Sequence, residues 1–567
     1  MHWSMVAWAL ALVTRLGDAV DKETGRNVGW PRWCGKVYKP EYPSFDPGGQ
    51  TLEPPRNGDE LLNLKIKPRW SIFLQGEHQG QFILNATPSP WFGQQWPLLK
   101  TTPPPMDIVV DIQPENVVLL RATIQVPLVD SITSFDLDSL APRLEPYRVR
   151  VTGFTGNEIP ITARTEFYYL PEKTSGSVTR LDNLNGGFHH RSPATHGRFE
   201  PFLPYGFYAS CDRFLCDKNS RQLIKKYHDD GFNSLVSLTT VFDSRAEYEY
   251  MESLDLRFMY DLRSYYKNLT AVREQVTAIK DSQAIFAYWA SDEPDGHQDA
   301  FHLVTDARDV IRSIDPYHPL AVTLNCQDYY YGPYTAGADI VMEDAYPIGI
   351  NTTWSKWGTT CNTTYGDCGC DNCRGGVYDV PERLDILARH ERWLNLWPKT
   401  KVHNLQAFHG EGYWARSPSL EELNAMNALA LMHGSKAQLA WLWPTSDDEG
   451  RHLAAFAPHI LANPMRDLIV RGRATRARVE CAVDKLHDQV DAAYWQVGDK
   501  LLLLLVSRVT LEGNHGVNIA LPSCLVPQRV VQDVWGNGRW LVQRGQLSLS
   551  LIRAMSVYMV VVDVMVV

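Results

Sequence analysis

Two acidic segments of the chain hold the residues best suited to chemistry. In YWASDEPDGH, Asp292 and Glu293 follow an apolar run and stand just before Pro294. In HGEGYW, Glu411 lies between two glycines. Glycoside hydrolysis uses two carboxyl groups on one sugar linkage, one to protonate the leaving oxygen and one to attack or to activate water. Glu293 and Glu411 are therefore candidate catalytic carboxyl groups.

The elements that must position these carboxyl groups are an alternation of strand-like and helix-like stretches. Between them lie helix-period stretches such as 298–314, 380–397 and 419–434, the last opened by the capping pair Ser419 and Glu422. Eight β/α units over about 270 residues match a (β/α)8 TIM barrel. A doubly wound open sheet is disfavoured because no G-x-G-x-x-G follows a strand. The apolar runs are 202–209, 232–238, 256–262, 284–290, 319–325, 338–348, 401–408 and 437–443.

The order of these runs places both candidate carboxyl groups at one face of the barrel. Asp292 and Glu293 end the fourth run, and Glu411 follows the seventh, three residues after Phe408. In TIM barrels the active site lies at the C-terminal ends of the strands. The two groups are therefore expected on one rim, ~5–5.5 Å apart if the mechanism is retaining and ~6.5–9.5 Å apart if it is inverting.

The flanks of the barrel have the period-two pattern of β structure. From 20 to 200, short alternating runs separated by Pro, Gly and Asn predict a β-sandwich, with 172–204 expected as linker and loop. From 473 to 567 strands return as a second all-β module. The expected organisation is a signal peptide at 1–19, a sandwich and linker at 20–200, the barrel at 201–472 and a β-sandwich at 473–567.

In its central part the chain resembles the retaining TIM-barrel glycosidases of clan A, which carry catalytic glutamates after strands four and seven. The resemblance implies that Glu293 is the acid/base and Glu411 the nucleophile. The resemblance covers about 200–470, and the stretches WASDEPDG, ADIVMEDAYPI and LQAFHGEGYW also look like a poorly characterised microbial branch of glycosidase-like barrels. It implies that Tyr346, after strand six, orients the nucleophile and that Trp443, after strand eight, lies under the sugar. Trp414, Tyr208 and Asn325 are further candidate substrate contacts.

One position departs from the clan pattern. The clan usually has Asn before the acid/base glutamate, to hold the sugar 2-hydroxyl, and here that residue is Asp292. A second negative charge beside Glu293 raises the pKa of one of these two carboxyl groups, which suits a general acid that must stay protonated. Asp292 is accordingly a candidate substrate contact, while the standard 2-hydroxyl contact is in doubt.

Other assignments compete with this one. Glu343 with Asp344, after strand six, is the rival for the second carboxylate, although a loop hydrogen bond is the plainer role for Glu343. A non-catalytic carbohydrate-binding or cell-wall protein on a degenerate barrel would also account for Asp292 and for the loop position of Glu411. A polysaccharide lyase is a weaker alternative, because no basic cluster stands at the strand ends.

Several features predict export from the cell. Residues 5–13 form an apolar stretch before a small-residue site at 17–19, typical of a secretory signal, with a first helix of the fold as the alternative. Asn85, Asn268, Asn351 and Asn362 each begin a glycosylation sequon. The ten cysteines form an even set: Cys361, Cys368, Cys370 and Cys373 are expected in a disulfide-stapled loop, Cys211–Cys216 and Cys481–Cys524 as pairs, which leaves Cys34 and Cys326, with the connectivity open.

The composition argues against nucleic-acid and membrane partners, so a saccharide is the expected partner. The net charge of −10 and the lack of a long basic run disfavour nucleic acid. No stretch reaches the ~18–20 apolar residues that span a bilayer. His189 and His190 lack a third ligand at metal spacing, so neither a catalytic metal nor a cofactor is expected. The expected protein is a secreted glycoside hydrolase that acts on a poly- or oligosaccharide.

Overall fold

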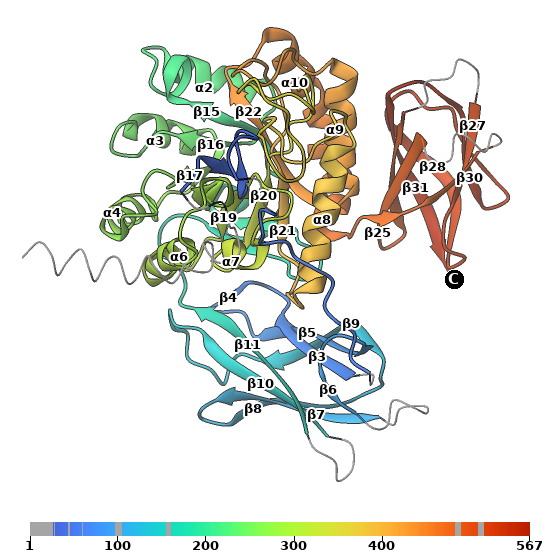
Figure 1. Ribbon diagram of the computed structural model, residues 1–567. Helices are drawn as coiled ribbons and strands as arrows, with labels where there is room; N and C mark the ends of the chain where they lie inside the picture. The colour runs from blue at the N-terminus through green and yellow to red at the C-terminus, as the bar shows by residue number, and fades with distance from the viewer. Residues whose placement is uncertain are drawn as a thin grey trace, which may run out of the picture.

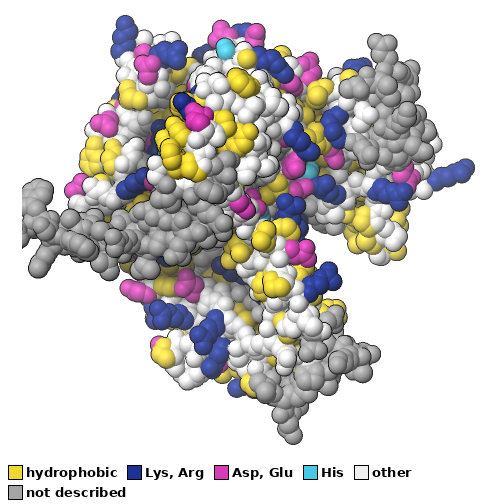
Figure 2. Space-filling model, viewed as in Figure 1, with side chains coloured by type: hydrophobic (Ala, Val, Ile, Leu, Met, Phe, Trp, Pro, Cys, Tyr) yellow, Lys and Arg dark blue, Asp and Glu magenta, His cyan; other side chains and the backbone are white. Residues whose placement is uncertain are grey.

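The computed structural model describes residues 27, 29–43, 46–58, 61–96, 105–154, 160–481, 489–508 and 515–567. Figure 1 shows a central barrel, a β-sandwich below it and a second β module at its side. The expected signal peptide lies outside the described residues. On the face in Figure 2, side chains of both charges are interspersed.

The N-terminal sandwich has two sheets around an apolar core. Phe82 stacks on Phe135 at 4.3 Å between ring centroids, and Phe167 packs edge-on against both. This core forms because apolar residues alternate along the strands, as expected for sheets with one face inward. One sheet runs β4 (Ile72–Leu74), β11 (Ile161–Leu170), β10 (Tyr147–Phe154), β7 (Met106–Gln113) and β8 (Val117–Ile124); the other runs β6 (Gln94–Gln95), β3 (Leu61–Pro68), β5 (Gln79–Ser89) and β9 (Leu128–Asp136).

The segment expected as linker and loop contains a small sheet. Phe188 and Phe202 pack edge-on against Phe286 of the barrel, at 6.1 and 5.3 Å. They belong to a cluster of barrel-interior residues, so this sheet closes the N-terminal end of the barrel. The sequence prediction was wrong because these strands are short and pack against side chains of the barrel interior. They are β12 (Val178–Leu181), β13 (Phe188–Arg191) and β14 (Glu200–Phe202).

The eight predicted strands form a closed parallel barrel, which confirms the expected fold class. The first strand pairs with the last, so the sheet has no free edge. The apolar runs mark buried strands, as parallel sheets covered by helices require. In order the strands are β15 (Tyr205–Ser210), β16 (Ser234–Leu238), β17 (Arg257–Asp261), β18 (Ile285–Asp292), β19 (Leu320–Leu324), β20 (Ile340–Glu343), β21 (Thr400–His403) and β22 (Ser435–Trp443).

The seventh strand is shorter than its apolar run suggested. β21 ends at His403, although burial continues to Ala407. Gln406 is buried in irregular backbone, where its side chain bonds the N–H and C=O of Ile348 at 2.8 and 2.9 Å. The run expected to end at Phe408 therefore continues past β21 as buried, mostly irregular backbone, with one isolated parallel bridge between Gln406 and Trp441. Glu411 lies eight residues beyond the strand end, not three.

Helices surround the barrel, and α9 begins at the predicted capping pair. Ser419 accepts a hydrogen bond from Glu422 N and Glu422 Oε2 accepts one from Ser419 N, at 3.2 and 2.8 Å, which forms the expected capping box. The helices are α2 (Ser220–Asp229), α3 (Arg245–Ser253), α4 (Leu269–Ile279), α5 (Pro294–His297), α6 (His302–Ile314), α7 (Tyr331–Thr335), α8 (Asp379–Trp393), α9 (Leu420–Met432), α10 (Asp447–Leu461) and α11 (Met465–Arg471).

The C-terminal module is a second pair of antiparallel sheets. Its residues Leu502, Leu504 and Met559 belong to the same apolar cluster as the helix layer of the barrel, so the module is packed against α9 and α11. One sheet runs β23 (Thr475–Arg476), β25 (Val490–Val497), β26 (Lys500–Ser507), β31 (Ser556–Val566) and β28 (Leu525–Trp535); the other runs β24 (Arg478–Cys481), β27 (His515–Ala520), β30 (Gln546–Ile552) and β29 (Trp540–Gln543).

Four disulfides form among the described residues, and one expected pair does not. Cys481 and Cys524 are both free. Cys481 ends β24, where it pairs with Val517, whereas Cys524 stands just before β28 in the other sheet. The expected Cys481–Cys524 bond is therefore wrong. The disulfides are Cys34–Cys326, Cys211–Cys216, Cys361–Cys368 and Cys370–Cys373.

A short hairpin near the N-terminus lies on the barrel rim, apart from the sandwich. It consists of β1 (Arg32–Trp33) and β2 (Lys36–Val37), and Cys34 in its turn is bonded to Cys326 after β19. In Figure 1 this dark-blue hairpin lies over the barrel strands. Residues far apart in the sequence therefore meet at the rim that was expected to hold the site.

Candidate active site

A pocket of about 370 Å³ opens at the C-terminal rim of the barrel. It is within the size range of small-ligand sites, and carboxyl groups and aromatic rings share its wall. Its lining residues are Trp33, Tyr38, Tyr208, Asp292, Glu293, Thr323, Asn325, Asp344, Tyr346, Lys356, Trp357, Asp367, Gly369, Asn404, Phe408, Glu411, Tyr413, Trp414 and Trp441.

Glu293 is placed by the abrupt end of β18. Its N–H donates to the carbonyl of Thr323 on β19 at 3.0 Å, so its backbone is still tied to the barrel sheet. Its φ is 47°, a left-handed conformation that non-glycine residues rarely adopt. Pro294 then begins α5 and turns the chain away. The side chain is half-buried in the pocket wall.

Glu293 lies beside Asp344, the first residue after β20. Between them lies Asn325, whose Nδ2 donates to Glu293 Oε1 at 2.9 Å and lies 3.4 Å from Asp344 Oδ1. Two carboxyl groups this close oppose each other's ionisation. The ends of strands four, five and six thus hold two neighbouring carboxyl groups around one side-chain amide.

Burial and like charge keep this pair protonated at higher pH than free carboxyl groups. Burial, and then the charge of Asp344, raise the pKa of Glu293 well above its usual value. Burial raises the pKa of Asp344 to about 7. Asp292 has a pKa raised to about 8, first by burial and then by Glu293. A carboxylic acid that stays protonated near neutral pH is what a general acid requires.

Asp292 lies beside the pair and contacts an arginine. Its Oδ2 is 3.4 Å from Arg263 Nη1, and its side chain is 33% exposed. Arg263 also contacts Asp261 at 3.2 Å, so its charge is divided between two carboxyl groups. Asp292 therefore keeps a raised pKa and an exposed face toward the pocket.

A buried aspartate fixes the strand end that carries Asn325. Asp295, on α5, accepts hydrogen bonds from the N–H groups of Asn325 and Cys326 at 3.2 and 2.9 Å. Burial raises its pKa to about 7. Asp295 is thus a support of the rim between β18 and β19, and it does not line the pocket.

Aromatic side chains form the pocket wall, as expected for Tyr208, Tyr346 and Trp414. Tyr208 packs edge-on against Trp441 at 5.2 Å. Trp414 donates its indole N–H to the carbonyl of Tyr346 at 2.8 Å, and Phe408 packs edge-on against both rings. Flat apolar faces with polar edges suit the faces of a sugar ring.

Glu411 lines the same pocket, but from a turn rather than from a strand end. It lies at the tip of a tight turn between Gly410 and Trp414, with a φ of 58° and an exposed side chain. The strand end itself carries Asn404, whose N–H donates to the carbonyl of Glu343 at 2.9 Å. The structure therefore brings Glu411 to the pocket without burying it.

Trp443 is displaced from the expected position under the sugar. Its ring packs against Phe207, Tyr227 and Phe232 at 5.1–5.7 Å, in the layer between strands and helices, and it does not line the pocket. Pairing of β15 with β22 shifts register before Trp443. An extra residue in a strand reverses the facing of the residues beyond it, so Trp441 lines the pocket instead.

The rival carboxylate Glu343 has a structural environment. It is fully buried, with Oε1 2.5 Å from Nδ1 of His403 and Oε2 accepting from the N–H of Ala345 at 2.9 Å. Its neighbour Asp344 is the residue of this pair that reaches the pocket.

The disulfide-rich loop after β20 supplies a wall that sequence reasoning did not assign. Lys356 lies over the ring of Tyr413 at 3.9 Å, and Trp357 stacks on Tyr38 at 4.9 Å. Asp367 accepts a hydrogen bond from the hydroxyl of Tyr413. Their spacing carries no periodic signal, because long loops rather than barrel strands bring them to the pocket.

No cluster of three or more His, Cys, Asp or Glu that could hold a metal ion occurs among the described residues. In that same part of the chain, no helix is long and apolar enough to cross a membrane.

Comparison with known proteins gives structural neighbours only. No protein-family model matches the sequence, and no curated protein does. An FMN-binding β-glucuronidase from Facaelibacterium prausnitzii is 12% identical, covers 81% of this chain and 72% of its own, and has a TM-score of 0.32. Bacteroides uniformis β-glucuronidase 3 is 9% identical over 88% of this chain and 74% of its own, with a TM-score of 0.30.

A family 30 subfamily 8 glycoside hydrolase, a xylanase from Clostridium acetobutylicum, is 10% identical over 63% of this chain and 95% of its own, with a TM-score of 0.37. These neighbours are glycoside hydrolases by name. At such identities and TM-scores they do not fix the activity of this chain, and the chemistry of the pocket must decide it.

Proposed function

We propose that this protein is a glycoside hydrolase whose active site is the pocket at the C-terminal rim of the barrel. The observation that carries the proposal is the pair of neighbouring carboxyl groups, Glu293 and Asp344, in a pocket walled by aromatic rings. Breaking a glycosidic bond needs a carboxylic acid that is still protonated at working pH.

Glu293 is the proposed general acid. Its proton passes to the glycosidic oxygen as the bond to the anomeric carbon breaks, and the resulting carboxylate later accepts a proton from water. Two features support this role: its half-buried position, and the neighbouring Asp344, whose charge opposes ionisation of Glu293. Asp292, whose pKa is raised to about 8, offers a second protonated carboxyl group beside Glu293 in the pocket wall.

Glu411 is the proposed nucleophile of a retaining double displacement. It lines the pocket with Glu293, and its exposed carboxylate is free to approach the anomeric carbon. Gly410 and Gly412 on either side have φ of 99° and 81°, so the turn needs glycine at both positions. Asp344, beside Glu293 in the same pocket wall, is the alternative second carboxylate.

The proposed substrate contacts are the other pocket residues. Tyr208, Tyr346 and Trp414 offer ring faces and edges, and Trp441 takes the place expected of Trp443. Asp292 and Asn325 offer hydrogen bonds to sugar hydroxyl groups. The mixture of stacking faces and short polar side chains suits a poly- or oligosaccharide.

The second candidate function is a non-catalytic carbohydrate-binding protein. The loop position of Glu411, away from a strand end, favours it, because catalytic groups are better fixed by rigid elements. It predicts sugar binding without turnover.

We further propose that the protein is secreted, since four disulfides form most readily in an oxidising compartment.

The test is a screen of aryl glycosides and cell-wall polysaccharides, with the product anomer followed by NMR. Hydrolysis with retained configuration, lost in Glu293→Gln, supports the proposal. Inverted product would move the second role to a base acting through water. Binding without hydrolysis of any substrate favours the carbohydrate-binding function.

A further inference from the structure

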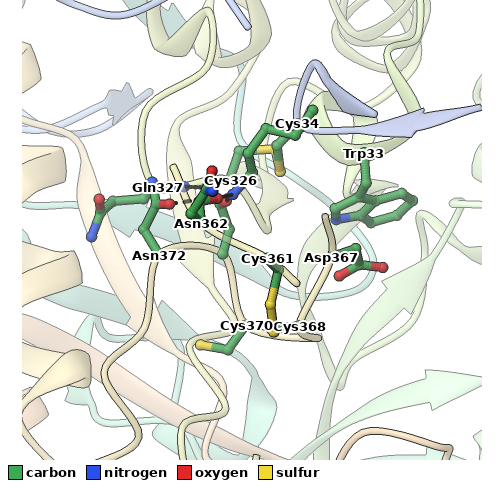
Figure 3. A network of polar contacts seen from close by, with 12 residues as sticks. Trp33, Cys34, Cys326, Gln327, Cys361, Asn362, Asp367, Cys368, Cys370 and Asn372 are labelled. Atoms are coloured by element: carbon green, nitrogen blue, oxygen red, sulfur yellow. Dashed lines mark hydrogen bonds and ion pairs between the residues drawn. A yellow bond between two sulfur atoms is a disulfide. The ribbon is translucent and has the colours of Figure 1, made fainter. Parts of the chain in front are cut away.

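The hairpin β1–β2 is fastened to the barrel rim on two sides. On one side, Cys34 in its turn is bonded to Cys326, the residue that follows Asn325. On the other side, Lys36 forms an ion pair with Asp371 of the disulfide-rich loop. Figure 3 shows Trp33 and Cys34 on this hairpin, with Cys326 and the disulfide-rich loop around them.

The fastened hairpin places Trp33 against the candidate active site. The indole lies so close to Gly296 that a Cβ there would be 2.3 Å from the ring, and it packs edge-on against His297 at 4.9 Å. Its Nε1 donates a hydrogen bond to Oδ1 of Asn325 at 2.8 Å. Trp33 also lines the pocket.

This hydrogen bond fixes which end of the Asn325 amide faces the carboxyl pair. An indole N–H donates only, so it must meet the amide oxygen. The amide nitrogen then points toward Glu293 and Asp344, at 2.9 and 3.4 Å. Were the amide reversed, its oxygen would face a carboxylate and its nitrogen would face the indole N–H, which are two unfavourable contacts.

The backbone of Asn325 is held independently of Trp33. Asp295 accepts its N–H at 3.2 Å, and Arg383 donates to its carbonyl at 2.5 Å. The main freedom left to Asn325 is therefore rotation of its amide. The charged and titratable groups that face the carboxyl pair are Asp292, Asp295, Asp367 and Arg383, with Arg263 behind Asp292.

We propose that Trp33 is a positioning residue of the acid site, which acts through Asn325 to aim an N–H donor at the Glu293–Asp344 pair. The catalytic consequence of this positioning rests on the proposed function, whereas the effect of Trp33 on the pKa of the carboxyl pair does not. The hairpin, with its disulfide to the strand-five end, is then a structural part of the site rather than a tether between modules.

The direction of the effect follows from the donor. An N–H that donates to a carboxyl oxygen stabilises the ionised form and lowers the pKa of the pair. Trp33→Phe keeps a ring beside Gly296 but removes the indole N–H, which frees the Asn325 amide to rotate. The titration midpoint of the carboxyl pair is then expected to rise by about 0.5–1 pH unit.

The experiment is an infrared difference titration of the protonated-carboxyl band in the full chain, assigned by its loss in Glu293→Gln. The expected upward shift in Trp33→Phe should be absent from Trp30→Phe, which changes an exposed Trp stacked on Tyr42 near the same hairpin. On an Asn325→Ala background, Trp33→Phe should add no further shift, because its effect passes through Asn325.

Two results would overturn the proposal. One is an unchanged titration midpoint of the carboxyl band in Trp33→Phe. The other is a Trp33→Phe shift in this midpoint that is equally large in the wild-type and the Asn325→Ala backgrounds. The double variant Cys34→Ala/Cys326→Ala supplies a second test, since it keeps the indole but releases the hairpin. An upward shift there supports the proposal, and an unchanged titration counts against the role of the hairpin. If the carboxyl band shifts as expected but no glycoside is hydrolysed, the proposed function fails while the positioning role stands.

Discussion

The two sides of the pocket rim differ in how they hold a carboxyl group. On the side of strands four to six, Glu293 and Asp344 both contact the side-chain amide of Asn325, within a shell fixed by Asp295. On the side of strand seven, Glu411 stands exposed at the tip of a turn. Buried, networked carboxyl groups have shifted pKa values, whereas an exposed group stays close to water and can move.

This difference suits two chemical roles. A general acid must hold a proton near neutral pH, and burial beside another carboxyl group does this. A nucleophile must be ionised and able to reach the anomeric carbon, which an exposed turn permits. The general acid is therefore assigned to the side with the buried network, and the role of the exposed Glu411 is the point that experiment must decide.

Glu411→Gln is the change with the largest expected effect. If Glu411 is the nucleophile, kcat on any accepted glycoside falls by about 10⁴-fold or more, because the covalent step is lost. Added azide should restore turnover and give a glycosyl azide of inverted configuration, detected by NMR. Activity within a few-fold of wild type would remove Glu411 from the mechanism and leave Asp344, or a group of the substrate itself, as the partner of Glu293.

Asp344→Asn tests the side with the buried network through pH. The charge of Asp344 raises the pKa of Glu293, so a neutral side chain lowers it. Glu293 then loses its acid proton at lower pH, and the alkaline limb of the kcat/KM profile moves down by about one pH unit or more. An unmoved alkaline limb would show that the pair does not control the acid.

A pair of tryptophans on one strand sharpens the comparison with a smaller effect. Trp441→Ala, in the pocket wall, should lower kcat/KM by about 10-fold through lost stacking, with a small loss of stability. Trp443→Ala should lower the free energy of unfolding by about 3 kcal/mol and leave kcat/KM nearly unchanged. Kinetics and chemical denaturation of both variants measure the contrast, and equal kinetic losses would contradict the placement of Trp443.

The sequence predicted the scaffold better than the pocket. Eight buried runs separated by helix-period stretches indicate a barrel, and the position of Glu293 follows because β18 ends abruptly before Pro294. Trp443 was misplaced because a register shift in one strand reverses the facing of its last residues, and residue types do not reveal such shifts.

Contacts between distant segments lay beyond sequence reasoning. Trp33 reaches Asn325 from 292 residues away, on a hairpin of two-residue strands with no periodic signal. The segment 172–204, expected as a linker, contributes the floor of the barrel. Sequence reasoning missed this because the strands of the segment are short and their packing partners come from the barrel. Such features depend on tertiary packing, which local propensity does not record.

The central claim is that Glu293 protonates the departing oxygen, and the most direct measurement is the leaving-group dependence of Glu293→Gln. Aryl glycosides whose phenols span a wide range of pKa should be compared in wild type and variant. The account predicts a loss of about 10²–10⁴-fold in kcat/KM for the poorest leaving groups, shrinking toward none for the most acidic phenols. A loss that is absent, or equal for every leaving group, would contradict it.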